Sequence, residues 1–272
     1  MTEATPSFAF VLYGSPPTLD THAIACAHSE LNPQAPALLA SPTQPGDETN
    51  TATLSFVDGK GEIILGTIAA AIPTGEAEAA AEFSVSRFSE AGAQPLNKHG
   101  AHAIVSLAPW RDSKPPDELV RLSWAIAAIA KATAGLAVYW GNGCVTHPAD
   151  FFIEGARDSG GETTLPHLWL GVSFAQEKSG VSFLTFGMQE QFVLPDLKVW
   201  APKGEQQDAL AYTLNLASYV IDRGVSISAG ETVGRSADER LIVRYEPSPV
   251  GRDAQVMCVD LPGKRSWWPF RR

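Results

Sequence analysis

The side chains best suited to chemistry gather in one short segment, residues 139–147. Cys144 and His147 stand three positions apart there, at a turn that the sequence predicts to lead into a helix. A thiol at a helix N-terminus has a lowered pKa, and a neighbouring imidazole could deprotonate it, so the two could act as nucleophile and base. They could also supply half of a metal site. Because two residues complete neither a triad nor a four-ligand site, both are candidates only.

Three further side chains of this segment could line a binding pocket: Tyr139, Trp140 and Asn142. The Gly141–Gly143 turn could also cradle an anion above a helix N-terminus. The turn fits neither phosphate-binding pattern, GxxxxGK[ST] or GxGxxG after a strand. The chain also lacks GxSxG, HExxH and DxDxDG. This absence favours a non-catalytic protein, with a hydrolase or transferase at the 139–147 turn as the alternative.

Other titratable residues favour structural roles. The paired histidines His99 and His102 lack a third ligand, so we predict neither a metal nor a cofactor. An acidic group, Glu76, Glu78 and Glu82, is typical of a solvated first helical turn, although paired carboxylates could bind a divalent ion. The chain has three cysteines, which stand far apart without a CxxC motif, so we expect reduced thiols.

These residues must be positioned by helices and strands, which alternate early in the chain, whereas hairpins dominate later. Asp58-Gly59 between two apolar runs predicts a hairpin. We expect strands over 8–13, 52–57, 62–70, 101–107, 136–140, 168–175, 181–186, 191–200, 241–246 and 255–260. We expect helices over 19–31, 75–82, from 115 to an end at Gly135, over 147–157 and over 205–222.

This order predicts an α+β fold with a mixed, largely antiparallel sheet flanked by helices. We expect one domain over residues 1–262 and a basic, aromatic tail over 263–272, with a split near residue 160 as the alternative. The tail, GKRSWWPFRR, could contact a partner or an anionic membrane surface.

The charge and composition of the chain limit the classes of function that the protein can have. The formal net charge is −10, and residues 1–100 hold three Lys/Arg against eleven Asp/Glu. An acidic body argues against nucleic-acid binding, which needs clustered basic residues, and favours a basic protein partner. Hydrophobic residues make up 44% of the chain, enough for a sizeable core. Because the sequence shows neither a membrane-spanning run nor a secretory signal, we expect a cytoplasmic protein.

Several stretches, taken together in order, resemble the bacterial domain-of-unknown-function family 4261. They are AIPTGEAEAAAEFS at 71–84, KHGAHAIVSL at 98–107, AGLAVYWGNGCVTHPADFF at 134–152, LPHLWLGVSFAQEKSGVSFLTFGMQEQFVLPDLKVW at 165–200 and LNLASYVIDRGVSISAGETVGRSADERLIVRYEPS at 214–248. The resemblance implies an α+β protein and, through members found around secreted-toxin systems, an accessory or immunity role. It carries over no catalytic residue, and its pattern does not require a cysteine at Cys144.

These observations favour a non-catalytic protein-interaction module. An acidic protein is suited to neutralising a basic toxin that binds nucleic acid. A peripheral membrane or scaffold protein that uses the tail is a third possibility. The oligomeric state is left open by the sequence.

Overall fold

The computed structural model describes residues 8–40, 50–89, 99–157, 164–251 and 254–263. Its packing divides the chain into two compact units. The N-terminal unit comprises Met1–Val172 with Phe186–Leu194, and the C-terminal unit comprises Ser173–Thr185 with Pro195–Arg272. A single domain over 1–262 stays a prediction, and residues 264–272 of the predicted tail lie outside the described part of the chain.

The N-terminal unit is built on a seven-stranded antiparallel sheet of order β2-β3-β4-β5-β1-β6-β7. The predicted hairpin is confirmed as β3 and β4, joined by residues 57–61. The strands are β1 (Phe8–Tyr13), β2 (Leu38–Ala40), β3 (Thr51–Phe56), β4 (Glu62–Ile68), β5 (Ala101–Ala108), β6 (Ala137–Trp140) and β7 (Val145–Pro148).

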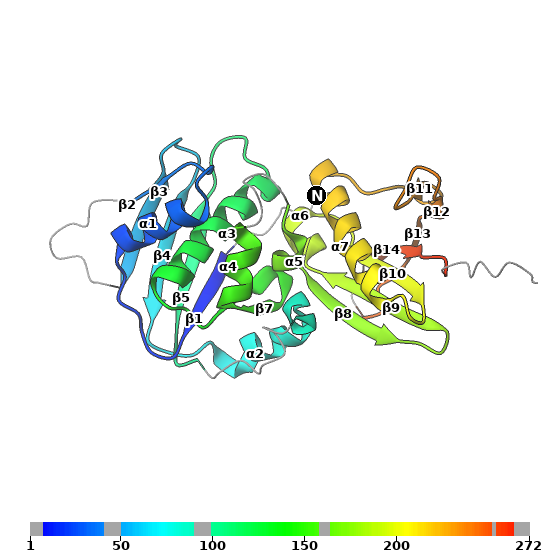
Figure 1. Ribbon diagram of the computed structural model, residues 1–272, viewed down its shortest axis with the longest axis horizontal. Helices are drawn as coiled ribbons and strands as arrows, with labels where there is room; N and C mark the ends of the chain where they lie inside the picture. The colour runs from blue at the N-terminus through cyan, green and yellow to red at the C-terminus, as the bar shows by residue number, and fades with distance from the viewer. Residues whose placement is uncertain (1–7, 41–49, 90–98, 158–163, 252–253, 264–272) are drawn as a thin grey trace, which may run out of the picture. The chain divides into compact units, whose positions relative to one another are not determined.

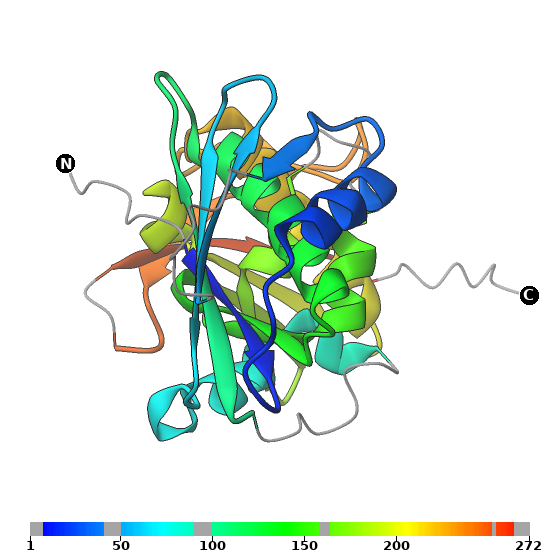
Figure 2. The same ribbon diagram turned by 90° about the vertical axis from the view of Figure 1, so that its left-hand side faces the viewer.

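Three helices cover one face of this sheet, as both views show (Figure 1, Figure 2). They are α1 (Thr21–Leu31), α3 (Pro115–Ala132) and α4 (Ala149–Arg157). Their apolar faces bury the core against inward side chains such as Val11, Leu65 and Val105. The short α2 (Glu76–Ala80) packs on the opposite face, where Ala77 and Ala80 bury Leu12 and Tyr139.

The end of α3 explains why a glycine stands at position 135. The left-handed residue that stops the helix is Ala134, with a φ of 51°, rather than the predicted Gly135. The Gly135 N–H donates to Ala130 O at 2.8 Å, which closes the helix end. A Cβ on Gly135 would lie 2.6 Å from Val11 Cγ1. Glycine is therefore needed here for the close approach of the chain to β1.

The C-terminal unit is built on a five-stranded mixed sheet of order β13-β14-β10-β9-β8. The β10–β14 pair is parallel, whereas β9–β10 and β13–β14 are antiparallel. Its strands are β8 (Gly171–Gln176), β9 (Gly180–Phe186), β10 (Leu197–Pro202), β13 (Arg244–Pro247) and β14 (Gln255–Asp260); β11 (Thr232–Val233) and β12 (Leu241–Ile242) form a separate ladder.

The long helix α7 (Gln206–Arg223) packs against β10. Burial alternates along β10, so Leu197 and Val199 lie on one face while Lys198 and Trp200 lie on the other. Two short helices, α5 (Pro166–Trp169) and α6 (Met188–Phe192), belong to the N-terminal unit. The predicted α+β class with a largely antiparallel sheet is thus confirmed.

Candidate functional site

The predicted binding residues Tyr139 and Trp140 lie in the core of the N-terminal unit. Tyr139 is 7% exposed, and its ring stacks on Phe10 with centroids 5.5 Å apart. Burial raises the pKa of Tyr139 to about 12, so its hydroxyl stays protonated. Trp140 is fully buried, and its ring stacks on the ring of Phe152 and on that of Trp169.

A hydrogen-bonded glutamine fixes the Trp140 indole. Its Nε1–H donates to Gln191 Oε1 at 2.7 Å. The Gln191 amide nitrogen in turn donates to Trp169 O at 3.0 Å and to Gly187 O at 3.1 Å. Gln191 itself is 1% exposed. These bonds satisfy polar groups inside the core, which is a structural role.

His147 is fully buried, and its ring stacks on Phe151 at 5.1 Å. Its Nδ1 lies 3.0 Å from Ser86 Oγ. Burial lowers the pKa of His147 to about 3, with the nearby His167 as a smaller cause. The imidazole is therefore neutral at physiological pH and a weak proton acceptor.

The structure corrects the predicted position of Cys144. Strand β7 stands between Cys144 and α4, because Val145–Pro148 pairs with β6. The thiol is therefore not at a helix N-terminus, contrary to the prediction from the sequence. Cys144 is exposed, has a φ of 52°, and follows the Gly141–Gly143 turn that contains Asn142. Within the described residues, no group of three or more His, Cys, Asp or Glu side chains is placed to hold a metal ion.

The histidines His99 and His102 have structural partners. Nδ1 of His99 lies 3.0 Å from Glu78 Oε1, and its Nε2 accepts the Ile72 N–H at 2.8 Å. The Nδ1–H of His102 donates to Ala70 O at 2.7 Å. Sequence reasoning favoured structural roles here but missed the His99–Glu78 pair, because these residues are 21 positions apart.

The N-terminal sheet has an open face, which we define by Ile64, Ile68 and Ile104. Their side chains are 49%, 41% and 37% exposed. Strand register places all three on the side opposite α1, α3 and α4, since Ile64 pairs with Ser106 and Ile104 with Phe10. Helix α2 covers the β1–β6 part of this side and leaves the β4–β5 part exposed.

Charge is distributed unequally between the two units. The N-terminal unit holds 8 Lys/Arg and 19 Asp/Glu, a formal net charge of −11, whereas the C-terminal unit holds 12 and 11, a formal net charge of +1. Glu62 is exposed on the open face itself, and Glu76 and Glu82 are exposed on and beside α2. The apolar open face therefore belongs to a strongly acidic unit.

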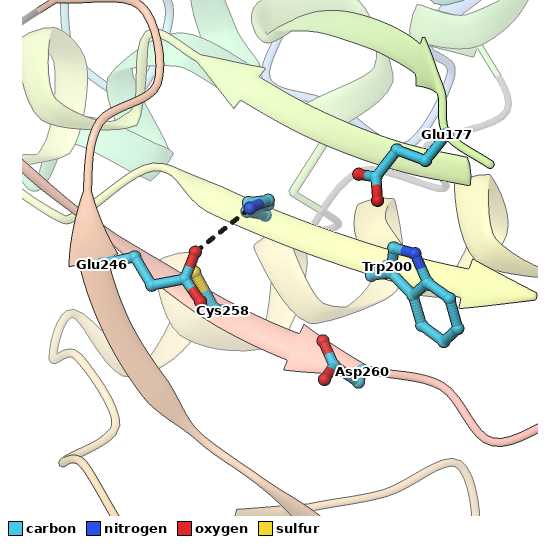
Figure 3. A pocket seen from close by; sticks show the side chains of 6 residues that line it. Glu177, Trp200, Glu246, Cys258 and Asp260 are labelled. Carbon is cyan, nitrogen blue, oxygen red and sulfur yellow. Dashed lines mark hydrogen bonds and ion pairs between the residues drawn. The ribbon is translucent and has the colours of Figure 1, made fainter. Parts of the chain in front are cut away.

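The C-terminal unit carries a cavity of about 270 Å³ on the polar face of its sheet (Figure 3). Its lining residues are Glu177, Lys198, Trp200, Glu246, Cys258 and Asp260. The Lys198 ammonium lies 3.1 Å from Glu246 Oε2; this contact raises the pKa of Lys198 and lowers that of Glu246. Both groups therefore stay charged at neutral pH.

Cys258 does not have the properties of a nucleophile. Burial raises its pKa to about 11, with the Glu246 carboxylate as a further cause, so the thiol stays protonated. Its Sγ–H donates to Val256 O at 3.6 Å. The cavity is thus better suited to binding than to acid–base chemistry. The sequence does not indicate this cavity, whose lining residues come from strands that are far apart in the chain.

The fold and these sites define an α+β protein with two sheet-based units. Residues 184–259 match the model of a family described as Domain of unknown function (DUF4261), which confirms the family resemblance over that segment. The matched segment includes Lys198, Trp200, Glu246 and Cys258 of the cavity. No curated protein and no solved structure matches the chain. No helix in the described ranges is long and apolar enough to cross a membrane.

Proposed function

We propose that this protein is a non-catalytic interaction module that binds a basic protein partner through the open face of its N-terminal sheet. The observation that carries the proposal is the combination of exposed Ile64, Ile68 and Ile104 with a unit of net charge −11. An apolar patch rimmed by polar residues is typical of a protein contact surface.

Charge complementarity selects the partner. A basic protein is drawn to an acidic unit by long-range attraction, which raises the association rate. A second copy of this chain would bring two units of charge −11 together, and this repulsion disfavours self-association. The open face therefore fits a basic partner better than a second copy.

A non-catalytic role is supported by the surroundings of three side chains whose types could otherwise serve in catalysis. His147 is buried and neutral, and the Tyr139 hydroxyl and the Cys258 thiol have raised pKa values. The alternative, a hydrolase or transferase at the 139–147 turn, would need a substrate to reach side chains that the core encloses. Cys144 is the exposed member of that segment.

The family resemblance suggests a biological setting for the proposal. An accessory or immunity protein of a secreted-toxin system would act in the cytoplasm and neutralise a basic toxin. An acidic unit with an apolar contact face is suited to that task. Contact of residues 263–272 with a membrane or with the partner remains part of the same proposal.

The test is co-purification of the tagged full chain with its partner, followed by size-exclusion chromatography and mass spectrometry. The test variant is the double substitution Ile64→Gln and Ile104→Gln, and the matched control is Ile242→Gln, which changes a 59% exposed isoleucine of the C-terminal unit. Full burial of an isoleucine contributes about 1.5–3 kcal/mol, so losing two half-exposed ones should weaken binding about 10- to 100-fold.

The expected result is a stoichiometric basic partner that the double variant loses and the control retains. The proposal fails if no stoichiometric partner is found, if the partner is acidic, or if the double variant binds as well as the control.

A further inference from the structure

A second cavity of the C-terminal unit, of about 580 Å³, is lined by α7 and by residues 232–240, and we call it the α7 cavity. Its volume lies within the ~300–1,000 Å³ range of small-molecule sites. Its polar lining includes Tyr212, Asn215, Thr232, Arg235, Glu239 and Arg240. None of these residues takes part in the proposed contact of the open face.

Tyr212 supplies an unsatisfied hydrogen-bond donor beside this cavity. The side chain is 7% exposed, and its Oη is buried with no hydrogen-bond partner in the described part of the chain. Burial raises the pKa of Tyr212 to about 12, so the hydroxyl remains a donor at neutral pH. Buried polar groups are nearly always hydrogen-bonded, so this one points to an acceptor that comes from outside the chain.

The charges of the α7 cavity favour an anion. Glu239 is held by Arg235, whose Nε lies 3.0 Å from Oε2 and whose Nη2 lies 2.5 Å from Oε1. The Arg235 backbone N–H also donates to Oε2 at 2.7 Å. The exposed Arg240 makes no ion pair among the described residues and adds a second positive charge. The residues that line the cavity therefore carry a formal net charge of +1.

An apolar wall completes the α7 cavity. Leu216, Val233 and the ring of Tyr219 contribute to it, and Tyr219 is 47% exposed. The Tyr219 hydroxyl accepts a hydrogen bond from Arg223 Nη1 at 2.6 Å, and the guanidinium also lies 5.3 Å from the ring centroid. These contacts restrain the ring as a flat surface for an apolar group.

We propose that the α7 cavity binds a small organic anion, with its carboxylate or phosphate group near Arg240 and Tyr212 and its apolar body against Tyr219. The positive charge of Arg240 attracts the anion, since Glu239 neutralises Arg235, and the Tyr212 hydroxyl and Asn215 amide donate hydrogen bonds to its oxygens. Ligand sites commonly combine such an apolar wall with a few converging polar groups.

Isothermal titration of the full chain tests this inference with three probes of similar size: phenyl phosphate, benzoate and benzyl alcohol. We expect saturable binding of at least one of the two anions and much weaker binding of the neutral alcohol. Binding of phenyl phosphate alone would assign a phosphorylated ligand, and binding of benzoate alone a carboxylic acid. Absence of anion binding, or equal binding of the alcohol, would overturn the inference.

Two variants locate the site, and one controls for charge. Loss of one hydrogen bond in Tyr212→Phe should weaken anion binding about 2- to 10-fold, and loss of the charge in Arg240→Gln about 10-fold or more. Lys203→Gln removes a charge outside the cavity lining and should leave affinity unchanged. Thermal unfolding of each variant confirms that it folds. Unchanged affinity in both Tyr212→Phe and Arg240→Gln would refute the assigned site.

Discussion

The Gln191 network allows a quantitative prediction for the core of the N-terminal unit. Gln191→Leu keeps most of the side-chain volume but removes every hydrogen bond of the amide. The Trp140 Nε1–H then lies fully buried without its 2.7 Å acceptor, and two backbone carbonyls lose a donor. An unsatisfied buried polar group costs about 1–3 kcal/mol, so we expect a destabilisation of about 2–4 kcal/mol.

Urea unfolding followed by tryptophan fluorescence measures this loss. The matched control is Gln189→Leu in the same helix α6, whose side chain makes no hydrogen bond with another described residue and should change stability by less than about 0.5 kcal/mol. An NMR spectrum should show a shifted indole N–H resonance for Trp140 in Gln191→Leu. A stability loss no larger than that of the control would refute the structural role assigned to Gln191.

Two further predictions concern buried histidines and one glycine. Burial lowers the pKa of His147 to about 3 and of His28 to about 4. In the unfolded chain, each of these imidazoles binds a proton as the pH falls through about 6.5, whereas in the folded chain it stays neutral down to its lowered pKa. The stability of the fold is therefore highest above pH 6.5 and decreases as the pH falls below that value. Each histidine contributes a slope of up to about 1.4 kcal/mol per pH unit, and His147→Phe should reduce the slope measured by urea unfolding between pH 6 and 4.5. In Gly143→Ala, the new Cβ would lie 1.8 Å from Trp169 O, so we expect the stability of the fold to fall by more than about 3 kcal/mol. In the control Gly14→Ala, the new Cβ meets nothing within 4 Å, and stability should change by less than about 1 kcal/mol. Thermal unfolding measures both changes. Equal thermal midpoints for these two glycine variants would contradict the packing of the 141–143 turn.

Local patterns predicted the elements that depend on local interactions. The Asp58-Gly59 signal gave the β3–β4 hairpin, and an uninterrupted apolar periodicity gave α3 and α7 close to their observed bounds. The sequence does not predict strand β7, because the 139–147 turn and the helix predicted over 147–157 together cover its four residues. That strand forms through pairing with β6, which brings His147 opposite Val138. Four residues have too little internal pattern to indicate such pairing.

The order of the strands in the N-terminal sheet could not be predicted from the sequence, because it depends on pairing between strands that are far apart in the chain. Strand β1 lies between β5 and β6, more than 85 and 120 residues away along the chain. The pairing of β4 with β5, which places Ile64 and Ile104 on one exposed face, is likewise not visible in the sequence. Residue type alone makes the 139–147 segment a candidate site, and only packing shows that Tyr139, Trp140 and His147 are enclosed.

The two proposed surfaces differ in the charge they need, and this difference makes them separable by experiment. Attraction of a basic protein to the N-terminal unit weakens with salt, because its source is the formal net charge of −11 of that unit, to which exposed carboxylates such as Glu62, Glu76 and Glu82 contribute. An anion in the α7 cavity would instead be held by Arg240 and Tyr212 at short range. Raising the salt should therefore slow partner association markedly and reduce anion affinity less. The reverse order would place the dominant charge interaction in the C-terminal unit and contradict both assignments.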